Sequence, residues 1–507
     1  MRYIKSYNNT TDLRTDLAAG ELGHPYVAKV NNTIDFNSIT TNWENEYFTI
    51  IALTDGTISY SHKEGSNPMF YSINEGEWIE TTVSVDITVS KNDMIRFKSN
   101  RGNQAYNQET FTSGGTAQFA VAGNLMSLVA GDNFATYVPN TSATGTDGDL
   151  YCSFKNFFGN CKGLISAKNL IIKYCDNESF SNFFNGCANL LIPPELPATT
   201  LANSCYHQMF MSCTNLTTAP ALPATKLEGL CYNSMFYGCQ SLKTAPVLPA
   251  TTLAEGCYSG MFQFCSSLTT APELPVTTLA PYCYYGMFEG CTSLTTAPAL
   301  PATTLADDCY KSMFSNCTSL TTAPSILPAM TLKSSCCDSM FRNCSSLTTA
   351  PELPATDLRV YCCRDMFYNC TSLTTAPALP ATNLADDCYY GMFEGCTSLT
   401  TAPSILPAMA LYSSCYQSMF KGCTSLTTAP ELPATNTGRE FCYKEMFWNC
   451  SSLNYIKCLA KDINGYNESN WVYGVASTGT FVKNPKMTEW TTGFSGIPEG
   501  WTVIDAS

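Results

Sequence analysis

Cysteine is the residue of this sequence with the greatest potential for chemistry, and its spacing is regular. The chain has 27 cysteines among 507 residues, and from Cys205 onward most stand in pairs eight residues apart, such as Cys283 and Cys291. These pairs could form disulfides, or they could fill a core as thiols. On a helix, eight residues span about 12 Å, whereas the Cα atoms of a disulfide lie roughly 4.4 to 6.8 Å apart. The spacing therefore favours buried thiols.

Metal and catalytic chemistry need further polar groups, which the sequence does not cluster. It has three widely separated histidines, His24, His62 and His207, and no Cys-x-x-Cys pair that would favour zinc. The acidic pairs at 307–308 and 386–387 lack the alternating spacing of a calcium loop, so turns exposed to solvent account for them. We predict no enzyme, no cofactor and no metal site.

The cysteines belong to a long repeat that sets the architecture. Its last cysteine returns every 26 or 27 residues, twelve times, from Cys161 to Cys450. In a clean copy, apolar residues fall at helical spacing from Cys283 to Cys291, and a short strand is expected over 294–297. Such a period predicts a solenoid of stacked coils, each with one short helix and one short strand.

Two places of the repeat vary while the others barely change. Counted from the first cysteine of each coil, these are the third and the seventh places, which are neighbours on a helix. Their free variation fits a solvent face without constraint, or a tunable binding surface. In the second interpretation, aromatic and arginine side chains anchor a ligand. The candidate residues are Tyr237, Tyr285, Arg342, Tyr368, Tyr390 and Trp448.

The segments around the repeats read differently. Residues 1–39 are too short for a core of their own, and an edge strand or a flexible leader accounts for them unless they have a partner. Residues 40–145 hold β-rich runs at 47–53, 81–89 and 94–97, which predict a β-sandwich. The solenoid is assigned to 146–459, and 460–507 form a cap in which Trp490 and Trp501 pack or, alternatively, bind sugar.

The charge and hydropathy of the chain argue against some classes of partner. The net charge is −14, which argues against nucleic acid or an anionic membrane, because either needs a basic face. No run of about 18 apolar residues occurs, so membrane insertion is not expected. The first residues also lack the pattern of a signal peptide.

The repeat resembles a known family. Phe288-Glu-Gly-Cys-Thr-Ser-Leu294, found again at Phe393 to Leu399, is similar to the BspA-type leucine-rich repeat of gut Bacteroidales and their phages. The usual repeat of that family is a few residues shorter and has isoleucine at the first cysteine. The resemblance implies a leucine-rich-repeat-like fold over about 300 residues, in a family whose members bind varied partners.

A second, shorter resemblance concerns the N-terminus. Residues 25–37 look similar to N-terminal anchors of fibre-like virion proteins in crAss-like gut phages. Together the two resemblances imply a head or tail fibre or decoration protein of the virion, assembled in the bacterial cytoplasm. Residues 1–39 would contact capsid or tail proteins, and the solenoid a host surface glycan or protein. The chain would be a homo-oligomer, with a trimer favoured; the alternative is an adhesin on the bacterial cell surface.

The cysteine spacing gives a direct test. Thiol labelling of the denatured, unreduced protein should modify more than half of the 27 cysteines, because disulfides do not protect them. Mass spectrometry counts the labels, and a sample reduced before labelling is the control. Modification of only a few cysteines would contradict the assignment as core thiols.

Overall fold

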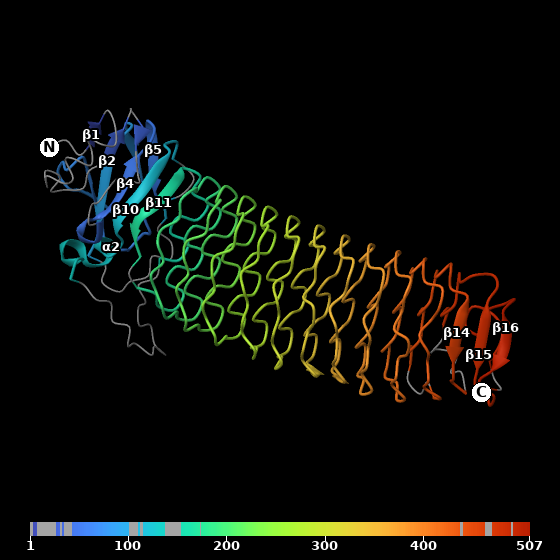
Figure 1. Ribbon diagram of the computed structural model, residues 1–507. Helices are drawn as coiled ribbons and strands as arrows, with labels where there is room; N and C mark the ends of the chain where they lie inside the picture. The colour runs from blue at the N-terminus through green and yellow to red at the C-terminus, as the bar shows by residue number, and fades with distance from the viewer. Residues whose placement is uncertain are drawn as a thin grey trace. The chain divides into compact units, whose positions relative to one another are not determined.

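The computed structural model describes residues 43–100, 110–111, 115–136, 154–172, 174–436, 440–461, 469–487 and 490–507, with the backbone of three short strands before residue 43. Most of the predicted anchor, residues 1–39, lies outside these ranges. The chain divides into two compact units, Met1–Ala224 and Thr225–Ser507. A β-rich region belongs to the first unit, and coils stack within each unit (Figure 1).

The β-rich region is built on one six-stranded sheet. The run of residues Phe48–Ala52 is apolar except for one threonine and is buried at every position, as expected of a strand with neighbours on both sides. In spatial order the sheet contains β11 (Leu164–Ile171), β10 (Phe119–Asn124), β4 (Phe48–Ala52), β9 (Met94–Lys98), β6 (Met69–Ile73) and β7 (Ile79–Thr81).

The remaining elements of this region are small. β5 (Gly56–Tyr60) pairs with β8 (Val85–Val89) in a separate two-stranded sheet. The helices are short turns, and the backbone before residue 43 adds a three-stranded sheet of its own. These elements are η1 (Trp43–Asn45), α2 (Ser127–Ala130), η2 (Gly131–Asn133), β1 (Ile4–Tyr7), β2 (Val27–Val30) and β3 (Thr33–Ile34).

These elements partly match the prediction for residues 40–145. The strands expected at 47–53 and 94–97 are present, but the run 81–89 is divided, with β7 ending at Thr81 and β8 beginning at Val85. The described residues do not show the expected β-sandwich. Instead, the main sheet extends past residue 145, because β11 belongs to the first repeat and pairs in parallel with β10.

Aromatic packing joins the same two regions of the first unit. The ring of Phe111 lies 5.4 Å from Phe157 and 5.7 Å from Phe158, the first aromatic pair of the repeats. Phe157 stacks in turn on Phe183 at 5.9 Å. Phenylalanine stands at these places where later coils have methionine. The larger rings fill the junction between the β-sheet and the first coil.

The predicted helix in each coil is absent from the described coils, and a ribbon of turns takes its place. In the clean copy, Tyr282, Gly286 and Gly290 have φ values of 55°, 55° and 72°. A left-handed residue at every fourth position cannot continue a right-handed helix. The apolar positions nevertheless face inward as predicted, and Cys283 and Phe288 are fully buried.

Hydrogen bonding explains why turns replace the helix. The amide of Met287 donates within the coil to Tyr284 O at 3.2 Å, but the next amide, of Phe288, donates to Met313 O in the following coil at 2.9 Å. This alternation repeats along the segment. A helix would use every amide internally, whereas the turn ribbon leaves every second one to hold the next coil.

Identical side chains stack inside the second unit. Phe288 and Phe314, one coil apart, have ring centres 5.6 Å apart and planes within 7°. A parallel row of tyrosines is interrupted at Cys337 and Cys363, which stand buried in the tyrosine place. Both cysteines fill the core, as the sequence indicated.

The second cysteine of each pair has a specific bond. The thiol of Cys317 donates to Phe288 O of the preceding coil at 3.1 Å. Cys283 and Cys291, eight residues apart in one coil, are both free thiols. The same bond to a phenylalanine carbonyl is made by Cys187, Cys213, Cys265, Cys291, Cys344, Cys370, Cys396, Cys423 and Cys450.

Short parallel pairings complete the coils. The predicted strand at 294–297 is reduced to a single bridge, Thr296 to Thr322, which continues from coil to coil. Two-residue strands β12 (Thr331–Leu332) and β13 (Asp357–Leu358) pair beside the longer loops. After the last regular coil, a parallel sheet is formed by β14 (Tyr455–Cys458), β15 (Thr480–Lys483) and β16 (Thr502–Asp505).

Burial of the thiols predicts a dependence of stability on pH. Burial raises the pKa of Cys317 and of Cys396 to about 12, against about 8.5 in an unfolded chain. A raised folded-state pKa gives stability that is complete below the unfolded pKa and is lost as pH rises toward the folded pKa. Between about pH 9 and 10, each such thiol should lower the free energy of unfolding by about 1.4 kcal/mol per pH unit.

Denaturant titrations at several pH values measure this slope. Cys317→Ala should reduce it by the share of one thiol, whereas replacement of an exposed residue, as in Val247→Ala, should leave it unchanged. A free energy of unfolding that is constant from pH 8 to 10 would contradict buried neutral thiols.

Candidate functional site

The outer surface of the second unit carries the six residues predicted as candidates for ligand binding. The four-residue turn period places residues in alternating pairs, so that Cys231 and Tyr232 are buried while Asn233 and Ser234 are partly exposed. The third and seventh places therefore face outward in most coils, although the described coils contain no helix. Asp338 and Ser315, at 8% and 3% exposure, are buried exceptions. All six candidate residues are partly exposed, and each lies on a different coil. Their role in binding stays a prediction.

Arg342 and Tyr368 are brought together by stacking. The guanidinium carbon of Arg342 lies 3.9 Å from the ring centre of Tyr368 on the next coil. Its Nη1 atom also donates to Asp365 at 2.9 Å. Contact with a ring face and a carboxylate holds the guanidinium in place. Both candidates are thus partly satisfied within the chain.

Two other candidate aromatic residues are also covered by a cation of the chain. Arg364 lies 5.2 Å from the ring centre of Tyr390. The ammonium of Lys421 lies 5.6 Å from Trp448 and bonds to Glu445 at 2.9 Å. The seventh-place residue Tyr237 instead makes an edge contact with another ring. The six residues therefore form a line of local contacts along the unit rather than one cluster.

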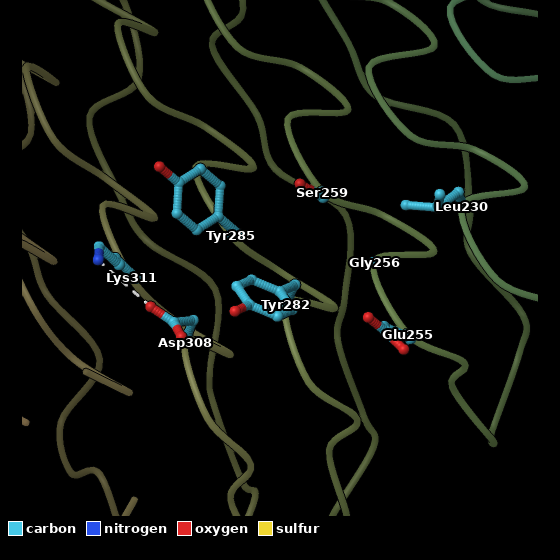
Figure 2. A pocket seen from close by; sticks show the side chains of 8 residues that line it. All are labelled: Leu230, Glu255, Gly256, Ser259, Tyr282, Tyr285, Asp308 and Lys311. Atoms are coloured by element: carbon cyan, nitrogen blue, oxygen red, sulfur yellow. Dashed lines mark ion pairs between the residues drawn. The ribbon is translucent and has the colours of Figure 1, made fainter. Parts of the chain in front are cut away.

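A pocket on this face lies beside Tyr285. A pocket of about 470 Å³ is bordered by Tyr285 and Tyr282, whose ring centres are 6.4 Å apart. In Figure 2 the rings of Tyr282 and Tyr285 lie between Glu255 on one side and the paired Asp308 and Lys311 on the other. The full lining is Leu230, Glu255, Gly256, Ser259, Tyr282, Tyr285, Asp308 and Lys311.

The charge of the pocket is negative. Glu255 and Asp308 face it, and the ammonium of Lys311 is shared between Asp308 at 3.3 Å and Asp338 at 3.5 Å. The Asp308 carboxylate, mainly through its charge, raises the pKa of the Tyr282 hydroxyl. A site with aromatic faces and unbalanced carboxylates attracts cations or hydrogen-bond donors.

A third variable row, not predicted from the sequence, is formed by the residue before the first cysteine of each coil. It contains Leu230, Tyr282 and Tyr361, with φ values of 56°, 55° and 58°, and their side chains are 41%, 43% and 38% exposed. Bulky residues are uncommon in this left-handed region, and such strain concentrates at functional sites. Large residues stand here where other coils have Gly, Ser or Asp, a contrast visible in the sequence.

Other groups considered from the sequence have structural roles. Asp307 and Asp386 accept the backbone amides of Ser334 and Ser413 at 3.0 Å, so the acidic pairs hold neighbouring coils. The indole of Trp501 is buried and donates to Ala476 O at 2.7 Å. This contact favours packing of Trp501 over sugar binding.

Trp490 has a packing contact as well. The ring of Trp490 packs against Trp471 at 5.3 Å. Within the described ranges, no three His, Cys, Asp or Glu side chains gather as a metal site would require. The same ranges contain no helix with the length and apolar character needed to cross a bilayer.

Comparisons with known proteins give one structural likeness. No protein-family model matches the chain, and no curated protein matches it. A crystal structure of a leucine-rich repeat protein from Bacteroides ovatus aligns with 77% of this chain and 95% of its own, at 17% identity and a TM-score of 0.42. No comparison points to a fibre-like virion protein.

The left-handed row leads to a stability prediction. Leu230→Asn should raise the free energy of unfolding by about 1 kcal/mol, because asparagine tolerates a positive φ far better than leucine. Val247→Asn is the matched control, since Val247 is 79% exposed and has an ordinary φ, and its effect should stay within about 0.5 kcal/mol. Chemical denaturation measures both. Destabilisation by Leu230→Asn would show that Leu230 is held by packing rather than strained.

Proposed function

We propose that the chain is a binding protein whose second unit presents its outer rows to a macromolecular ligand. One observation carries the proposal: large residues occupy strained, exposed positions on a framework that is otherwise nearly constant. The buried Cys, Tyr, Met and Phe places repeat because stacking requires them. Stacking does not require Tyr282 or Tyr361 on the outside. Their retention at a cost in backbone strain is explained by contact with a ligand. The proposal assigns no catalytic reaction to the chain.

The place of action is part of the same proposal. The chain would act on a phage virion, bound through residues 1–39 to capsid or tail proteins, as a homo-oligomer that adheres to a glycan or protein of the host surface. The support is the resemblance of residues 25–37 to virion anchors. The alternative is an adhesin on a bacterial surface, and the repeat resemblance fits both. Mass spectrometry of purified virions separates them, since absence of the chain from virions rules out the first.

Replacement of the outer aromatic residues tests the binding role. A variant with five aromatic residues changed to serine should be retained on gut Bacteroidales cells at least tenfold less than the purified wild-type protein. The substitutions are Tyr237→Ser, Tyr285→Ser, Tyr368→Ser, Tyr390→Ser and Trp448→Ser. The reason is that a few aromatic anchors supply most of an interface's binding energy. Flow cytometry with the labelled full-length chain measures retention.

A matched variant controls for changes outside the rows. The control variant carries five threonine-to-serine substitutions on another face of the same unit, and it should bind normally. The five exposed positions are Thr296, Thr322, Thr349, Thr375 and Thr401. Circular dichroism confirms that both variants are folded. Equal retention of the two variants would show that the third and seventh places are merely solvated.

A further inference from the structure

A duplicated coil provides an internal comparison for the pocket. The sequence from Tyr284 to Leu294 is repeated without change from Tyr389 to Leu399. Tyr285 and Tyr390 are therefore equivalent, but the coils before them differ. Arg364 precedes Tyr390 by one coil, and Ser259 stands at the same place before Tyr285.

That difference decides what covers each ring. Arg364 places its guanidinium 5.2 Å from the centre of Tyr390 and 5.5 Å from that of Tyr361. The side chain of Ser259 is too short to cover the ring of Tyr285. In the described part of the chain, no basic side chain lies over Tyr282 or Tyr285. The two copies share only the Tyr390/Tyr285 ring, because Gly256 stands at the place of Tyr361 and Tyr282 stands at the place of Asp387. In the copy that lacks the arginine, the space beside Ser259, Tyr282 and Tyr285 belongs to the pocket.

The pocket keeps the other partners of a cation. Along the same face, Arg342 combines a ring at 3.9 Å with a carboxylate at 2.9 Å, and Lys421 does the same with Trp448 and Glu445. At the pocket, two tyrosine rings and the carboxylates of Glu255 and Asp308 offer the same combination. Lys311 balances only part of this charge, because it is divided between Asp308 and Asp338.

We propose that the pocket between Ser259, Tyr282 and Tyr285 binds a guanidinium or ammonium side chain of a partner protein. The volume of about 470 Å³ suits an arginine or lysine end. Glu255 and Asp308 supply charge, and the two rings supply faces for cation–π contact. Gly256, also in the lining, lies close to Leu230, since a Cβ at Gly256 would meet Leu230 Cδ2 at 2.7 Å. The inference rests on the proposed binding function and names the partner chemistry of this one site.

Titration with a minimal peptide tests the proposal. Acetyl-Gly-Arg-Gly-amide, added to the full-length chain at low salt and followed by NMR, should bind at millimolar concentration. The same peptide with citrulline, which is neutral and similar in shape, should bind at least tenfold more weakly. Equal binding of the two peptides, or tighter binding of neutral methyl glucoside, overturns the proposal in favour of a hydrogen-bonding pocket.

Variants locate the bound peptide. Glu255→Gln and Tyr285→Ser should each weaken binding roughly 3- to 10-fold, and Glu273→Gln, an exposed carboxylate elsewhere on the unit, should leave it unchanged. Ser259→Arg should abolish binding by filling the pocket as Arg364 covers Tyr390, with stability unchanged. Undiminished binding by Ser259→Arg contradicts the proposal. If the peptide fails to bind while the serine variant of the outer rows still loses cell retention, this inference fails and the binding function stands.

Discussion

The alternating backbone hydrogen bond is the interaction on which the rest of the structure depends. In each turn ribbon, one amide closes a turn within its coil and the next reaches the following coil, as Met287 and Phe288 do. A left-handed residue at every fourth position makes this alternation possible. These backbone hydrogen bonds hold successive coils in register, which brings identical side chains into stacks. The aromatic rows and the thiol bonds therefore follow from the same geometry.

This geometry also explains the residues that tolerate it. Glycine adopts a positive φ without strain, and asparagine does so at modest cost. Asn316, Asn343 and Asn369 occupy left-handed positions on successive coils, and their amides bond to one another at 2.8 and 3.3 Å. Leu230, Tyr282 and Tyr361 have neither advantage. Their presence sets the variable face apart from a surface shaped by folding alone.

Neighbouring coils decide the properties of each outer site. The copies that contain Tyr285 and Tyr390 have the same sequence over eleven residues, yet one ring borders a pocket and the other lies beneath Arg364. A repeat protein built in this way changes a site by changing the coil before it, with no change to the residues of the site itself. The core is unaffected, because each coil packs only on its neighbours.

The sequence by itself determined the period, the inward set of residues and the outward places. These follow from side-chain type, since burial of apolar side chains such as those of Cys283, Tyr284 and Phe288 is favourable in either backbone conformation. The cysteine spacing also indicated thiols rather than disulfides, although the separation of about 12 Å expected for a helix does not apply, because the described coils contain turns instead.

The tertiary structure alone decided the backbone conformation, because an apolar pattern with pairs at spacing four fits both a helix and a ribbon of turns. The choice rests on hydrogen bonds to residues 25 or 26 positions away, as from the Phe288 amide to the Met313 carbonyl in the next coil. The same holds for the candidate site. Tyr285 was recognisable as an outward aromatic residue, but its pocket depends on Ser259 and Asp308 in the coils on either side. Contacts of this kind are made between coils, and the composition of one repeat does not contain them.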